Sequence, residues 1–250
     1  MKDGYVFSRG GVSMAGRHIS RAFMKAGYDV MCDFADAANS YKGDIIVREA
    51  KEEFGVNALW HAGSPSELMN IQEAINHANA VFGKPLKIFI NNDGVLDGMR
   101  LPELSEAQYK ELIEMHFVSF LNCAKAAGEE MAKHGGGVMI TVVALMPFPG
   151  TSPGFSFEIA LYRAFTESLA RSYEDKRVRF NTVISGKLEF PEDPLPPEGY
   201  KVEHQRHAVN FEDRPPMPKG DDPAEFLDMI VRIAESPKMN GQVFSLDIKF

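Results

Sequence analysis

Short apolar runs alternate with longer amphipathic runs along the whole chain. Most of the short runs are unbroken, a pattern typical of strands that are buried on both faces of a sheet. The longer runs repeat their apolar positions with the period of a helix. The predicted strands are 5–8, 28–34, 56–60, 86–91, 138–143, 178–184 and 243–246, and the predicted helices are 15–26, 44–54, 65–82, 105–133, 153–175 and 223–235.

Several of the predicted helices begin with start signals. Ser64 and Pro65 lie at the start of the third helix, Ser105 lies at the start of the fourth, and Asp222 and Pro223 lie at the start of the last. A capping side chain or a proline in the first turn favours the start of a helix at these places. Strand–helix alternation over residues 1–250 predicts a single α/β domain, with a doubly wound parallel sheet of about seven strands.

One segment, residues 187–222, interrupts this alternation. It has no clean period, and prolines cluster in it. A long irregular stretch inside a compact domain is usually a lid, a binding loop or an interface arm. A mobile surface loop is an equally good interpretation of this Pro-rich arm.

Composition and charge narrow the function classes. The chain has 250 residues and is 44% hydrophobic and 25% charged, which excludes collagen-like and fully disordered proteins. The net charge of -8 makes nucleic acid an unexpected partner, because an acidic surface repels phosphate backbones. Cys32 and Cys123 lie in apolar stretches, so we expect buried thiols in a reducing compartment. With no signal-like leader and no apolar run of membrane-spanning length, the sequence predicts a soluble, cytoplasmic protein.

A glycine-rich turn separates the first strand from the first helix. It reads SRGGVSMAGR over residues 8–17 and contains Gly10, Gly11 and Gly16. Glycines at such a turn let the backbone approach a pyrophosphate at the helix N-terminus. Asp33, at the end of the second strand, either accepts hydrogen bonds from an adenosine ribose or is a solvated charge at a strand end. The turn is therefore a candidate dinucleotide-binding loop.

A second motif, Ile90-Asn91-Asn92-Asp93-Gly94, follows the fourth strand. Together with the glycine turn it resembles the short-chain dehydrogenase/reductase family, which has TGxxxGxG in the first turn and NNAG here. Residues 165–170, 178–181 and 240–243 match further stretches of that family. The resemblance covers essentially the whole chain and implies a Rossmann-type sheet, a nicotinamide cofactor and usually a dimer or tetramer.

The resemblance also implies four catalytic side chains, namely a tyrosine, a lysine one helical turn later, a serine and an asparagine. Counting from the matched motifs places His116 at the asparagine, Val143 at the serine, Phe155 at the tyrosine and Ile159 at the lysine. Phenylalanine has no hydroxyl to exchange, and isoleucine has no charge to tune one. We therefore expect no catalysis of the family type in this chain.

A shifted alignment does not restore the missing pair. Tyr162 lies two turns beyond Phe155, roughly 10 Å along the helix axis. The residue four positions after Tyr162 is Thr166, where the family mechanism requires lysine.

The cofactor positions that the resemblance implies are altered as well. Met14 replaces a glycine of the turn, Arg9 replaces the preceding threonine, and Asp93 replaces a small alanine. Ala62 lies near the position of an expected aspartate. A carboxylate beside a diphosphate adds like-charge repulsion, so we expect this chain to bind no nicotinamide cofactor. The vestigial loop and its neighbours are Gly10, Gly11, Met14, Gly16, Asp33, Asn91 and Asp93.

The remaining titratable residues near the cleft are His116, Asp93 and Glu158. A histidine with a carboxylate is sufficient for proton abstraction beside a carbonyl. The alternative is a histidine that serves packing and a solvated glutamate. His204 and His207 lie three residues apart in the arm, but no third ligand accompanies them, so no metal site is predicted.

The loss of family residues on a complete fold favours a structural role. The leading hypothesis is a non-catalytic subunit of a hetero-oligomer, most simply a heterotetramer, with a catalytic family member. Its interface comprises helices 105–133 and 153–175 and the C-terminal segment. The partner holds NAD and oxidises a hydroxyacyl thioester of coenzyme A, because the pattern resembles the inactive subunits of heteromeric acyl-CoA dehydrogenases of the family. The alternatives are a nicotinamide-independent isomerase or lyase using His116 or Asp93, and a ligand-binding homo-oligomer.

Overall fold

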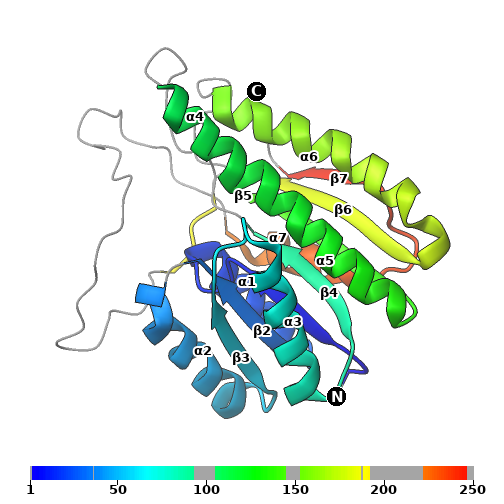
Figure 1. Ribbon diagram of the computed structural model, residues 1–250. Coiled ribbons are helices and arrows are strands. Elements are labelled where there is room, and N and C mark those ends of the chain that lie inside the picture. Colours follow the sequence, from blue (N-terminus) through cyan, green and yellow to red (C-terminus); the bar gives the residue numbers. More distant parts are fainter. Residues whose placement is uncertain are drawn as a thin grey trace.

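A parallel sheet of seven strands forms the centre of the molecule in the computed structural model, which describes residues 2–35, 37–92, 105–144, 153–186, 188–191 and 222–246. The strand order is β3-β2-β1-β4-β5-β6-β7 (Figure 1), which is the predicted doubly wound topology. The strands are β1 (Tyr5–Arg9), β2 (Asp29–Phe34), β3 (Ala58–Ala62), β4 (Leu86–Asn91), β5 (Gly137–Ala144), β6 (Val178–Ser185) and β7 (Val243–Leu246).

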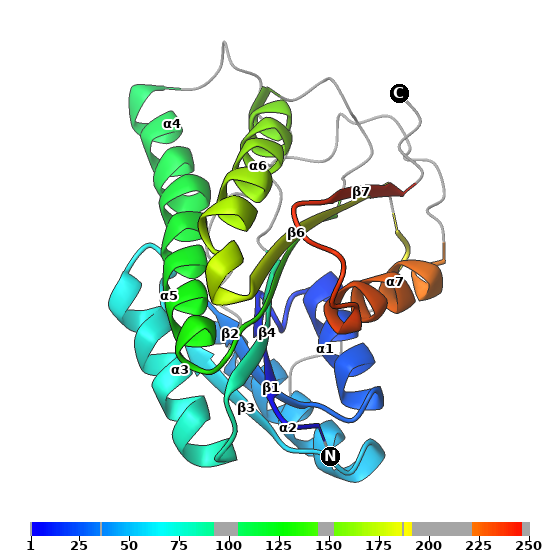
Figure 2. The ribbon, with the colours of Figure 1, turned by 90° about the vertical axis from the view of Figure 1, so that its right-hand side faces the viewer.

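Helices cover both faces of this sheet (Figure 2). One face carries α1, α2 and α7, and the other carries α3, α5 and α6. Short 3-10 turns lie at η1 (Ala37–Asn39) and η4 (Glu174–Lys176). The helices are α1 (Met14–Lys25), α2 (Ser40–Glu53), α3 (Leu68–Phe82), α4 (Glu106–Leu112), α5 (Ser119–Lys133), α6 (Pro153–Ser172) and α7 (Ala224–Glu235).

The two-sided cover explains the unbroken apolar runs in the sequence. Within β1, Val6 belongs to the apolar cluster beneath α1 and α7, whereas Phe7 belongs to the cluster beneath α3, α5 and α6. All residues of β1 and β2 are buried. Cys32 and Cys123 are buried free thiols, as predicted.

Several helices differ from the sequence prediction: the helix predicted over 44–54 begins at Ser40, and the helix predicted over 153–175 ends at Ser172. The helix predicted over 65–82 begins at Leu68, because the backbone first forms a turn in which the carbonyl of Ser64 accepts from the amide of Glu67. The helix predicted over 105–133 is not one regular α-helix: a π-helical segment, η3 (Ile113–Val118), separates α4 from α5. Such segments are rare and often mark functional sites.

The Pro-rich arm at 187–222 lies mostly outside the described residues. At its beginning, Leu188 and Phe190 pack against the apolar cluster beneath α1 and α7. The ring of Phe190 stacks on His18 of α1, with ring centroids 5.2 Å apart. The arm therefore starts on the α1 side of the sheet. Among the described helices, none has the length and apolarity needed to cross a membrane.

The C-terminal end of α7 is capped by a side chain from β6. The guanidinium of Arg179 donates to the carbonyl oxygens of Ile233 and Ala234, at 3.3 and 2.8 Å, and to that of Met239 at 2.9 Å. The last carbonyls of a helix have no partner within it, and a cation there is favourable. Arg179 therefore fastens α7 and the turn before β7 to the sheet.

We expect Arg179→Met to lower the free energy of unfolding by about 2 kcal/mol, because three carbonyls lose a charged donor. Denaturant unfolding monitored by circular dichroism measures this change. Arg171→Met is the matched control, since Arg171 is exposed on α6 and pairs only with Glu167 among the described residues. Its effect should stay within about 0.5 kcal/mol, and equal losses in the two variants would contradict the capping role.

Candidate functional site

The candidate residues gather where the strands end. Arg9 is the last residue of β1, Asn91 is the last of β4, and Asp33 is the penultimate residue of β2. The glycine turn follows β1 directly and leads into α1. In open α/β sheets, ligands bind at this carboxyl edge. The structure thus brings the predicted turn, Asp33 and Asn91 to one edge, while Asp93 lies outside the described residues.

Close contact of the chain with itself explains the glycines of the turn. Gly10 has a φ of +70°, and a Cβ on it would lie 2.0 Å from the carbonyl oxygen of Asn92. A Cβ on Gly16 would lie 1.9 Å from the carbonyl oxygen of Gly10. A side chain fits at neither position. These glycines therefore have a packing role that is independent of any ligand.

Ser13 joins the turn to the motif after β4. Its hydroxyl caps α1 by accepting from the amide of Gly16 at 3.1 Å, and it accepts from the side-chain amide of Asn92 at 3.0 Å. Met14, at the predicted glycine position, is the exposed first residue of α1. The turn is thus held by side chains of the protein itself.

The carboxylate of Asp33 lies between two basic side chains. Sheet register pairs Asp33 with Arg9 on one side and with His61 of β3 on the other, so all three side chains share one face. Asp33 Oδ2 is 3.5 Å from Arg9 Nε, and Asp33 Oδ1 is 2.8 Å from His61 Nδ1. The side chain of Asp33 is 1% exposed, that of Arg9 7% and that of His61 23%. The interpretation of Asp33 as a solvated charge at a strand end is therefore wrong.

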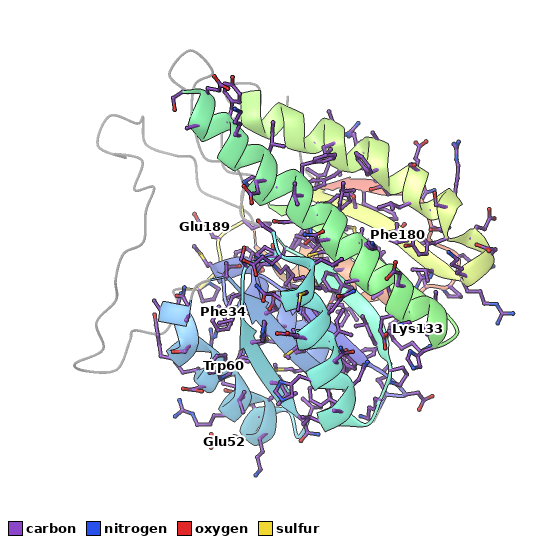
Figure 3. The ribbon with its side chains drawn as sticks, viewed as in Figure 1. Phe34, Glu52, Trp60, Lys133, Phe180 and Glu189 are labelled. Atoms are coloured by element: carbon purple, nitrogen blue, oxygen red, sulfur yellow. The ribbon has the colours of Figure 1, made fainter. Side chains whose placement is uncertain are left out.

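Of this Arg9–Asp33–His61 cluster, the sequence indicated Arg9 and Asp33 as cofactor positions, but it placed the next candidate at Ala62, beside His61. Trp60, in the same strand, lies beside Phe34 (Figure 3), with ring centroids 5.7 Å apart. Its Nε1 donates to Asp44 at 2.9 Å. His61, the next residue, points to the opposite face and meets Asp33. The hydrogen bond with Asp33 raises the pKa of His61 above its ordinary value, against an opposing effect of burial.

The positions matched to the catalytic residues of the family have different surroundings. Val143 is buried in the apolar cluster beneath α3, α5 and α6, and Ile159 packs against the same cluster. His116 lies in η3 and is 4% exposed. Tyr162 packs on Phe120, with ring centroids 5.1 Å apart. The side chains of Phe155 and Glu158, and all of His204 and His207, lie outside the described residues.

Together, the strand order, the glycine turn at the start of α1 and the polar carboxyl edge define an α/β domain of the dinucleotide-binding class. Comparison with family models identifies it further. The model described as short chain dehydrogenase matches residues 6–191, and the chain belongs to this oxidoreductase family.

Individual relatives are distant. The cis-4-hydroxycyclohexanecarboxylate dehydrogenase of Sinomonas cyclohexanicum is 25% identical over 186 residues, which is 73% of this chain and 72% of that protein. The D-xylose 1-dehydrogenase of Caulobacter vibrioides is 27% identical over 203 residues, covering 80% and 78% of the two chains. The structure of L-sorbose reductase from Gluconobacter frateurii, complexed with NADPH and L-sorbose, superposes with a TM-score of 0.77 at 19% identity, covering 98% of this chain and 95% of that one. This likeness confirms the predicted fold.

The raised pKa of His61 predicts a pH-dependent contribution to stability. The contribution is fully present below the ordinary pKa of 6.5 and is lost as pH rises through the higher pKa of the folded state. The difference in unfolding free energy between the wild type and His61→Gln should therefore shrink with rising pH. Urea unfolding below and well above pH 6.5 measures it. His77→Gln, at an exposed histidine of α3, is the control, and an equal pH trend there would contradict this origin.

Proposed function

We propose that this chain is a non-catalytic member of the short-chain dehydrogenase family that assembles with a catalytic, NAD-dependent paralogue. The observation that carries the proposal is the position of Val143 and Ile159. Val143 belongs to the buried apolar cluster beneath α3, α5 and α6, and the partly buried Ile159 packs against it, at the places where the resemblance implies a serine and a lysine.

The chemistry of the family explains why these two positions support a non-catalytic role. Hydride transfer to a carbonyl carbon, or from the carbinol carbon of an alcohol, requires a proton donor or acceptor at the oxygen and a group that tunes the pKa of that donor or acceptor. Val143 lies opposite Ile184 in the sheet, so the end of β5 offers a hydrocarbon contact there. Ile159 likewise supplies packing and no charge. Neither side chain binds or protonates a substrate oxygen.

The helices of the proposed interface are well packed within the subunit. The ring of Phe120 on α5 contacts the rings of Tyr162 and Phe165 on α6, with centroids 5.1 and 5.9 Å apart. Tyr109 and Ile113, on α4 and η3, are exposed. Exposed large apolar side chains on neighbouring helical segments support a role in subunit association.

The C-terminal segment supports the same role. β7 is an edge strand of the sheet, and all of its residues are at least partly exposed. An edge strand presents unpaired backbone groups that another chain can cover. The proposed interface therefore comprises 105–133, 153–175 and the C-terminal segment, most simply in a heterotetramer.

In this proposal the partner holds NAD and oxidises a hydroxyacyl thioester of coenzyme A. The pattern of replaced residues resembles the non-catalytic subunits of heteromeric family members such as 2-[hydroxy(phenyl)methyl]succinyl-CoA dehydrogenase. The alternative of a nicotinamide-independent isomerase or lyase requires His116 to reach a substrate, and its 4% exposure weighs against that role.

Co-expression with a catalytically intact paralogue tests the proposal. We expect the two chains to elute as one complex in size-exclusion chromatography, and calorimetric titration to find NAD on only half of the chains. The present chain alone should not reduce NAD with hydroxyacyl thioesters. Separate elution, or NADH formation by this chain alone, would overturn the proposal.

A charge on the exposed apolar surface should prevent assembly. Because Ile113 is exposed, Ile113→Glu should leave the fold intact while placing a desolvated carboxylate in the interface. We expect it to abolish co-purification with the paralogue. Met69→Glu, at an exposed apolar residue of α3 outside the proposed interface, is the matched control and should co-purify normally.

A further inference from the structure

The proposed absence of a cofactor has a specific structural basis at the end of β2. In dinucleotide-binding folds, an acidic residue about 20 positions after the glycine turn accepts hydrogen bonds from the adenosine ribose. Asp33 has that position in sequence and in the sheet. A ribose hydroxyl must come within about 2.7 Å of a carboxylate oxygen. The oxygen must therefore be open to the ligand.

The carboxylate of Asp33 does not meet this condition. Its side chain is 1% exposed, with Arg9 Nε at 3.5 Å from Oδ2 and His61 Nδ1 at 2.8 Å from Oδ1. Both oxygens thus face basic groups of the protein, where a bound ribose would present its hydroxyls.

Arg9 is held in this place by the sheet. Its backbone lies between β2 and β4, in register with Asp33 on one side and with Asn91 on the other. Its guanidinium is always charged and its side chain is 7% exposed. Displacing it from Asp33 would separate two buried opposite charges, which is unfavourable even though His61 stays beside the carboxylate. Arg9, Asp33 and His61 therefore do not fit a nicotinamide dinucleotide whose adenosine ribose donates hydrogen bonds to the acidic residue of the second strand.

We propose that Arg9 closes the adenosine subsite by acting as an internal substitute for the ribose, with His61 completing the closure from β3. In this proposal, Arg9 is the main residue that excludes adenine dinucleotides, and Met14 contributes less to that exclusion. Shortening Arg9 frees Asp33 and opens a site for adenosine nucleotides. This inference deepens the proposed function but is separable from it, because it concerns binding by this chain alone and not assembly.

The test compares AMP and NAD binding to the wild type and to Arg9→Thr, by calorimetric titration and thermal shift. We expect no detectable binding of either nucleotide to the wild type, and we expect Arg9→Thr to bind AMP at least about tenfold more tightly than the weakest affinity that the titration detects. Arg9→Lys keeps a cation beside Asp33, so this variant should still fail to bind AMP. Arg9→Thr combined with Asp33→Asn should lose the gained binding, because the carboxylate acceptor is gone.

Two further variants keep the proposal falsifiable. Met14→Gly should not bind AMP, and binding equal to that of Arg9→Thr would overturn the assigned role of Arg9. His61→Ala removes a partly exposed side chain and should also raise AMP affinity, by less than Arg9→Thr, even where Arg9→Thr fails to fold. AMP binding by the wild type, or no gain in either folded variant, would overturn the inference and leave the assembly experiment unaffected.

Discussion

A parallel sheet covered by helices on both faces leaves little room for polar side chains except at the carboxyl ends of its strands. In this sheet, six polar residues lie side by side in register, one from each of β3, β2, β1, β4, β5 and β6. We call them the polar row. All of these side chains point to the face of α3, α5 and α6, because residues in register on parallel strands share a face. The row consists of His61, Asp33, Arg9, Asn91, Thr141 and Thr182.

Burying a polar side chain costs free energy unless another group pairs with it, and different groups do so along the row. On the β2 side, a carboxylate with 1% exposure requires cations, and Arg9 and His61 supply them. On the β6 side, the hydroxyl of Thr182 lies 2.6 Å from that of Thr166 on α6. At the centre of the row, both polar atoms of the buried Asn91 side chain have no hydrogen-bond partner among the described residues. Two residues beyond Thr141, on the same face, the strand becomes apolar at Val143.

The sequence was sufficient for the fold because its signals are local. Strands β4 and β7 occupy the predicted residues, since each corresponds to a short apolar run in the sequence. The π-helical segment at Ile113–Val118 was missed, because a wider turn hardly changes apolar periodicity over so short a stretch. The role of His61 was missed for another reason. It depends on the register of β3 against β2, which no local pattern specifies.

The glycine turn has a consequence for how such motifs are read. Gly10 and Gly16 are required by contacts with the Asn92 carbonyl and with the turn's own backbone, whatever lies outside. The folding of the polypeptide thus keeps this signature in place without help from a nucleotide. A search that relies on the glycine turn alone would class this chain as dinucleotide-binding. A search that also considers the side chains beside the carboxylate of the second strand would distinguish it from such proteins.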